Sequence, residues 1–182
     1  MNQPEAARAT ILRRFRLVLG LFILGLILSG ITAFPLHSEL ELLTKIRGLE
    51  TRTPADASNG FDRWIITVRD GLRESYAQHP WLAYGTDWLA FGHIVIALFF
   101  IGPLRDPVRN IWVLHASLIA CVLVLPLALI CGPLRHIPFG WRVVDCSFGV
   151  FGFIPLYYCL RLTRTLAQSG ATKEEAITTR AG

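Results

Sequence analysis

Four long stretches without a charged side chain constrain the fold of this chain more than any other feature of its sequence. They lie between the flanking pairs Arg16 and Glu39, Asp87 and Arg105, Arg109 and Arg135, and Asp145 and Arg161. A charge at the centre of a bilayer costs roughly 2.5 to 3.5 kcal/mol, and a helix needs about 20 residues to cross a hydrocarbon core about 30 Å thick. The stretches therefore predict four transmembrane helices, at about residues 15–36, 87–104, 110–132 and 143–162.

The composition of the 182 residues agrees with this interpretation. Only 17% of them are charged and 53% are hydrophobic, whereas a soluble domain has about 25% charged residues. We therefore expect an all-α integral membrane protein, a four-transmembrane-helix bundle that forms one membrane domain over residues 1–164. The fourth helix needs Val143, Val144 and the aliphatic part of Arg161 to cross the core, because its uncharged stretch is short.

The first apolar stretch has an alternative interpretation as a cleaved signal peptide. Arg13, Arg14 and Arg16 precede it, and residues 31–33 (Ile-Thr-Ala) resemble a cleavage site. The apolar run is longer than the roughly 7 to 15 residues of a signal peptide. We therefore expect a helix that stays in the protein.

Small residues in the first and fourth helices predict close helix packing. Gly25, Ser29 and Ala33 recur every four residues, which places them along one face where another helix can approach. Gly149 and Gly152 offer similar positions in the fourth helix. Chance in a glycine-rich membrane segment is the alternative.

The basic residues predict the orientation of the chain. Arg8, Arg13, Arg14 and Arg16 precede the first helix, so the N-terminus is expected in the cytoplasm of a bacterial cell with the protein in the inner membrane. An even number of helices returns the C-terminus to the same side, where the polar segment 165–182 is expected to be a disordered tail. The net charge of +5 is spread over helix ends, which favours lipid headgroups over nucleic acid as its partner.

The connection between the first two helices is much longer than a simple turn between spans. Its sequence predicts two extracytoplasmic amphipathic helices, at about 39–47 and 61–78. Ser38 and Glu41 can form a capping box for the first, and Asn59 can cap the second. Apolar residues of the second fall on one face (Phe61, Trp64, Ile65, Val68, Leu72, Tyr76), with charged residues on its other faces (Asp62, Arg63, Arg69, Asp70, Arg73, Glu74). Such a helix could lie in the headgroup layer, cover the bundle or dock a partner.

Two histidines, His93 and His115, lie inside predicted spans, where ionisable residues are functional candidates. Haem b between two helix histidines is one hypothesis. The expected depths of these two residues differ by roughly 13 Å along the bilayer normal, too far for one haem. His93 could instead pair with His37 or His136, and the alternative for each intramembrane histidine is a neutral polar group in helix packing.

A cluster of polar residues is expected at the outer rim of the bundle. Arg142 and Asp145 are three residues apart on a helix and can form an ion pair. The cluster could bind a quinone headgroup, an anionic lipid or a small polar ligand, and helix anchoring by interfacial charges is the alternative. Its members are Asp87, His93, Arg135, His136, Trp141, Arg142 and Asp145.

The four cysteines contain no C-x-x-C motif, which argues against a zinc or thioredoxin-like site. Cys131 and Cys146 are expected near the outer ends of adjacent helices, where an oxidising compartment would permit a disulfide. The alternative is that they are small apolar packing residues.

No nucleophile and base can be placed together from the sequence, so it favours a non-enzymatic role. We expect a subunit or ligand- or lipid-binding scaffold of a membrane complex, in contact with the lipid bilayer and with other membrane subunits or a second copy. One alternative is an electron-transfer protein that binds haem b or quinone. Another is a small oligomeric transporter.

Overall fold

The computed structural model describes residues 3–181, with side chains described for residues 5–169. Over residues 3–181 the chain forms helices and no strand, which confirms the all-α prediction. The helices are α1 (Gln3–Ala33), α2 (Leu36–Ile46), η1 (Pro54–Asp56), α3 (Gly60–Gln78), η2 (Pro80–Leu82), α4 (Ala83–Phe99), α5 (Ile101–Arg105), α6 (Ile111–Pro126), η3 (Leu127–Cys131), α7 (Gly132–Leu134) and α8 (Phe139–Ala181).

Within the described part of the chain, four helical segments are long and apolar enough to cross a membrane, as the sequence predicts. They are Glu5–Ala33, Pro80–Arg105, Ile111–Leu134 and Phe139–Ser169. The second begins earlier than predicted, and the Thr86 hydroxyl within it donates to the Ala83 carbonyl. Four such helices indicate a multi-pass membrane protein.

The chain forms two compact units, although the sequence suggests one domain over 1–164. One unit comprises residues 1–24 and 98–182, and the other comprises residues 25–97. The boundaries lie within α1 and within α4.

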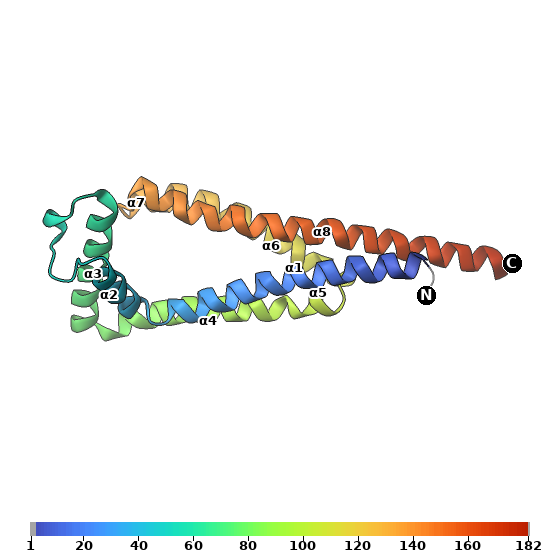
Figure 1. Ribbon diagram of the computed structural model, residues 1–182, viewed down its shortest axis with the longest axis horizontal. Coiled ribbons are helices and arrows are strands. Elements are labelled where there is room, and N and C mark those ends of the chain that lie inside the picture. Colours follow the sequence, from blue (N-terminus) through green and yellow to red (C-terminus); the bar gives the residue numbers. More distant parts are fainter. Residues whose placement is uncertain (1–2, 182) are drawn as a thin grey trace. The chain divides into compact units, whose positions relative to one another are not determined.

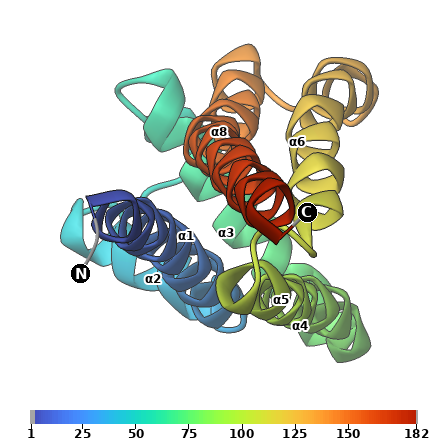
Figure 2. The same cartoon turned by 90° about the vertical axis from the view of Figure 1, so that its right-hand side faces the viewer.

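In the first unit α6 packs along α8, and the two helices lie side by side in both views (Figures 1 and 2). A Cβ atom added to Gly149 would lie 2.5 Å from the carbonyl oxygen of Cys121, and one added to Gly152 would lie 3.1 Å from the Cys121 sulfur. The backbones therefore approach as closely as the small residues allow. Gly149 and Gly152 occupy the packing positions for which the sequence proposes them.

The N-terminal half of α1 completes the core of the first unit. Phe15 and Leu19 are fully buried, and the Phe22 ring meets the Phe100 ring edge-on with 5.1 Å between centroids. Arg16 Nε donates a hydrogen bond to the Leu104 carbonyl at 3.3 Å, which satisfies one acceptor at the end of α5.

The helix that begins with α6 changes its winding at Pro126. Proline lacks a backbone N–H and cannot continue the regular hydrogen-bond pattern. The next turn, η3, is π-helical, and α7 follows it. The segment Ile111–Leu134 is therefore one span with an internal irregularity.

Helix α8 continues to Ala181, into the segment 165–182 for which the sequence favours disorder. Extending an existing helix costs less than nucleating one, and Ala, Lys and Glu have high helix propensity. Disorder of the tail stays a prediction, and the side chains beyond residue 169 lie outside the described residues.

The second unit joins the end of α1 to α4 at a different small residue from those predicted. Gly30 is buried, and a Cβ added there would lie 2.9 Å from the Ala90 carbonyl oxygen and 3.1 Å from the His93 Cβ. Gly25 and Ser29 are exposed, and Ala33 is half-buried. The close approach in this unit therefore occurs on the Gly30 face of the helix.

Candidate functional site

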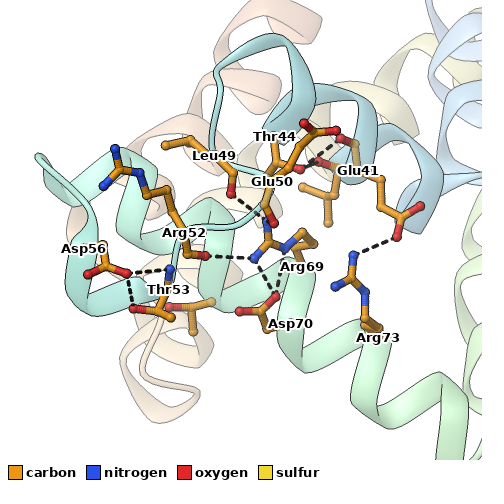
Figure 3. A network of polar contacts seen from close by, with 12 residues as sticks. Glu41, Thr44, Leu49, Glu50, Arg52, Thr53, Asp56, Arg69, Asp70 and Arg73 are labelled. Atoms are coloured by element: carbon orange, nitrogen blue, oxygen red, sulfur yellow. Dashed lines mark hydrogen bonds and ion pairs between the residues drawn. The ribbon is translucent and has the colours of Figure 1, made fainter.

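The segment Leu36–Gln78, which we call the loop module, contains α2, η1 and α3 and the richest polar network of the second unit (Figure 3). Its centre is Arg69 of α3, which is only 3% exposed. Arg69 Nη1 donates to the carbonyls of Leu49 and Glu50 at 2.9 and 3.2 Å. Its Nη2 donates to the Arg52 carbonyl at 3.2 Å, and its Nε donates to Asp70 at 2.8 Å.

The local sequence explains why an arginine occupies this position. Gly48 adopts a left-handed conformation with φ of 66°, which ends α2 and reverses the chain. The following residues, Leu49 to Arg52, form no regular helix, so their carbonyls need donors from elsewhere. A guanidinium has five N–H donors in a fixed plane and can satisfy several carbonyls at once.

A second ion pair connects the end of α2 to the start of α3. Both Nε and Nη2 of Arg47 lie 2.7 Å from Oδ1 of Asp62, which is 4% exposed. The hydrogen bond from Arg47 lowers the pKa of Asp62 and raises that of Arg47. Asn59 caps α3 as predicted, since its Oδ1 accepts from the Asp62 amide at 2.9 Å.

A third contact lies on the exposed side of the module. Arg73 Nη2 donates to Glu41 Oε1 at 2.9 Å, and this hydrogen bond is the main reason that the pKa of Glu41 is lowered. His37 Nε2 lies 3.7 Å from the same oxygen, is buried and has no hydrogen-bond partner. Glu41 therefore receives a direct hydrogen bond from Arg73 and a weaker attraction to His37.

These residues border a polar groove of about 350 Å³ between α2 and α3. Two carboxylates and three cations line it, so it suits a ligand or protein surface that carries both signs of charge. Among the described residues no group of three His, Cys, Asp or Glu could hold a metal ion. The residues that line the groove are Glu41, Leu42, Thr44, Lys45, Glu50, Arg69 and Arg73.

Two predictions for the loop module were wrong. The sequence places Asp62 and Arg69 on the charged faces of α3, apart from its apolar face, yet both are buried. Arg69 lies under the carbonyls of residues 49–52, and Asp62 is paired with Arg47. The capping box of Ser38 and Glu41 does not form, because α2 begins at Leu36 and Glu41 binds Arg73 instead. Asp62 and Arg69 are seven residues apart and lie on one face of α3, and this spacing is a signal that could have marked a second contact face.

The residues predicted for the outer rim belong to different units. Asp87 and His93 lie in the second unit, and Arg135, His136, Trp141, Arg142 and Asp145 lie in the first. Among the latter, Arg135, His136 and Asp145 are exposed, whereas Trp141 and Arg142 are half-buried.

Arg142 and Asp145 do not form the predicted ion pair, because Arg142 turns toward its own hairpin. Its aliphatic part packs against Gly132, where an added Cβ would lie 2.5 Å from its Cδ. Its guanidinium lies over the Phe139 ring, 5.2 Å from the centroid, and its Nε is buried without a hydrogen-bond partner. Arg142 thus anchors the hairpin through aliphatic packing and a cation–π contact.

His93 is half-buried against α1 near Gly30. Its Nδ1 lies 2.8 Å from the Leu89 carbonyl. A carbonyl can only accept, so this contact requires Nδ1 to be the donor, and in a neutral imidazole Nε2 is then the acceptor.

The other histidines proposed as haem ligands do not form pairs within either unit. His37 belongs to the loop module, and no hydrogen bond or ring contact joins it to His93. In the first unit His115 and His136 are both exposed, and no such contact joins them. The four cysteines, all within the described side chains, are free thiols, so Cys131 and Cys146 form no disulfide.

Comparison of the chain with known protein families, curated proteins and solved structures finds no match.

Proposed function

We propose that this chain is a multi-pass protein of a bacterial inner membrane that acts as a non-enzymatic subunit or ligand- or lipid-binding scaffold of a membrane complex. Both termini face the cytoplasm, as the arginines before the first span favour. The loop module then lies on the outer face. The observation that carries the proposal is the burial of Arg69 and Asp62 within that module.

A connection between two spans needs only a few residues, and it has no need for buried charges. Burying an ion pair has a desolvation cost of several kcal/mol per ion unless the geometry is favourable, so such pairs contribute more to a defined conformation than to stability. In the loop module the Arg47–Asp62 pair joins the end of α2 to α3, and the hydrogen bonds of Arg69 hold residues 49–52 against α3. A fixed polar surface of this kind favours recognition of a partner or ligand.

Native mass spectrometry of the full chain, extracted from its own membranes in a mild detergent, tests this proposal. We expect a retained subunit or lipid. A variant with reversed charges in the groove, Lys45→Glu with Arg73→Glu, should lose a subunit that docks there, while Arg63→Glu on an exposed part of α3 should keep it. A monomer with neither lipid nor partner would contradict the proposal.

A second candidate function is electron transfer through His93. The Leu89 carbonyl fixes the protonated nitrogen of its ring, and the remaining Nε2 could accept a hydrogen bond from a quinol or coordinate haem iron. The absence of a second histidine beside it within its unit favours quinone over haem. A visible spectrum of protein from iron-replete cells distinguishes the two, because a Soret band that disappears in His93→Ala would indicate haem.

A further inference from the structure

An aromatic pocket opens at the start of α4 in the second unit. It has a volume of about 310 Å³ and is lined by Phe34, which follows α1, and by Tyr84, Asp87, Trp88 and Phe91. The four residues of α4 are spaced i, i+3, i+4 and i+7, which places them on one face of the helix. The Trp88 ring meets the rings of Tyr84 and Phe91 edge-on, with centroids 6.0 and 5.8 Å apart.

Asp87 is the only charged residue in this lining. Its carboxylate forms no hydrogen bond or ion pair with any described residue, although it is half-buried. Its oxygens are not among the buried side-chain atoms that lack a partner, so the carboxylate keeps contact with solvent and its negative charge is accessible to a cation. A bound cation would restore the missing interaction.

The aromatic rings favour the same kind of ligand. The face of an aromatic ring attracts cations, and aromatic side chains around a quaternary ammonium are a common recognition device. Four rings and one carboxylate are therefore complementary to an ammonium group and repel an anion. A phosphate alone would meet no cation in this lining, and its only donors there would be the Tyr84 hydroxyl and the Trp88 indole N–H.

The place of the pocket identifies the source of the cation. It lies near the beginning of the span Pro80–Arg105, where aromatic residues typically meet the lipid headgroups. Tyr84 and Trp88 are 62% and 58% exposed, so the pocket opens outward from the helix. Leu89 and Ile96, further along α4, are also exposed and apolar, and they offer a surface for an acyl chain.

We propose that this pocket binds the ammonium headgroup of a membrane lipid, with Asp87 as its counter-ion and Trp88 as its principal aromatic contact. The inference rests on the proposed membrane location and specifies the lipid class that the scaffold retains.

The test uses the full chain in detergent with equal amounts of phosphatidylethanolamine, which carries an ammonium group, and phosphatidylglycerol, which does not. Native mass spectrometry should show preferential retention of phosphatidylethanolamine. Asp87→Asn should weaken that retention about fivefold, the effect of one partly exposed ion pair. The matched amide variant Glu74→Gln, whose exposed carboxylate lies outside the pocket, should retain it fully.

Trp88→Leu provides a second measurement that keeps the apolar surface and removes the cation–π contact, and it should also lower the preference. Equal retention of the two lipids by the unchanged chain, or an unchanged preference in Asp87→Asn, would overturn the inference. Displacement of the lipid by millimolar ethanolamine or choline would assign the pocket to a soluble ammonium compound instead, and would also overturn it.

Flotation of the chain with vesicles separates this inference from the proposed function. A chain that fails to float contradicts the membrane location itself. A chain that floats and shows no headgroup preference contradicts only the ammonium site.

Discussion

The loop module and the α6–α8 interface represent two different ways of ordering helices. In the module, α2 and α3 are joined through buried charges, with Arg69 donating to three backbone carbonyls. Between α6 and α8, the absence of a side chain at Gly149 allows backbone contact with Cys121. Hydrogen bonds donated by a side chain order the loop module, whereas the missing side chain of a glycine permits the close packing of α6 and α8.

This difference follows from the solvent that each region is expected to meet. Lipid gives little hydrophobic driving force between helices, so close van der Waals packing of small residues has to replace it. A segment in water can bury apolar residues such as Ile65 and Ile66 against α2, but it must also satisfy the carbonyls of its irregular parts. The same chain therefore uses both methods within a short sequence distance.

Among the substitutions that distinguish the two regions, Arg69→Met is expected to cause the largest loss of stability, and this loss should be confined to the loop module. The substitution removes the Arg69 donors from the Glu50 and Arg52 carbonyls and from Asp70, and it leaves the Leu49 carbonyl with the Arg52 amide alone. Each buried polar group that loses its partner costs about 1 to 3 kcal/mol. Hydrogen–deuterium exchange of the full chain should show lost protection over residues 44–70 and unchanged protection in α6 and α8.

The control for this substitution is Arg63→Met, which removes an exposed arginine from the same helix. It should leave exchange in the loop module unchanged. If Arg69→Met behaves in the same way, the polar network does not order the module.

A smaller loss of stability is expected from Gly149→Val. The new Cβ would lie 2.5 Å from a backbone oxygen, so α6 and α8 must separate, and such overpacking typically costs about 1 to 3 kcal/mol. Thermal unfolding in detergent should begin at a lower temperature. Gly140→Val, in the same helix with no atom within 4 Å of an added Cβ, should change the unfolding temperature much less.

As the pH falls, the loop module should lose stability before the α6–α8 interface does. Asp62 has a lowered pKa in the folded chain, so its contribution is complete above its ordinary value of 3.8 and is lost as the pH falls through the lower folded value. Exchange protection at the α2–α3 junction should stay constant from neutral pH to about pH 5 and decline below pH 3.8. In Asp62→Asn this decline should be absent, and a decline of equal size would show that another group causes it.

The smallest effect is expected from Arg73→Gln. Its ion pair with Glu41 is exposed on both sides, with 55% and 45% of the two side chains accessible, and such pairs contribute little to stability. Unfolding should shift by no more than a few degrees, while the pKa of Glu41 should return toward its ordinary value because the hydrogen bond from Arg73 is its main perturbation. Carboxylate titration by NMR measures that change, and an unmoved Glu41 would contradict it.

The spans and both helices of the loop module lie close to where the sequence places them, because charge spacing and apolar periodicity are local properties. The partners of the helices are not local. Gly25, Ser29 and Ala33 form a regular stripe, but it is Gly30 that contacts α4. Helix α1 is apolar on nearly all sides, so its sequence gives no direction toward a neighbour.

In the candidate site, the partners of charged residues could likewise not be predicted from the local sequence. The pattern of α3 separates apolar from charged positions correctly for Ile65, but it cannot show that residues 49–52 return to bind Arg69. That return depends on the left-handed turn at Gly48 and on carbonyls that lack helical partners. Arg142 is similar, since its contact with Gly132 depends on the hairpin between α7 and α8.

The π-helical turn after Pro126 determines where this span can tolerate the loss of a residue. A π turn accommodates one more residue than the α-helix that surrounds it. Deleting one residue within Leu127–Cys131 would convert the turn to α-helix and keep the register on either side. The same deletion within Ile111–Pro126 would rotate part of α6 by about 100° relative to α8. Length variation in this span should therefore concentrate in those five residues.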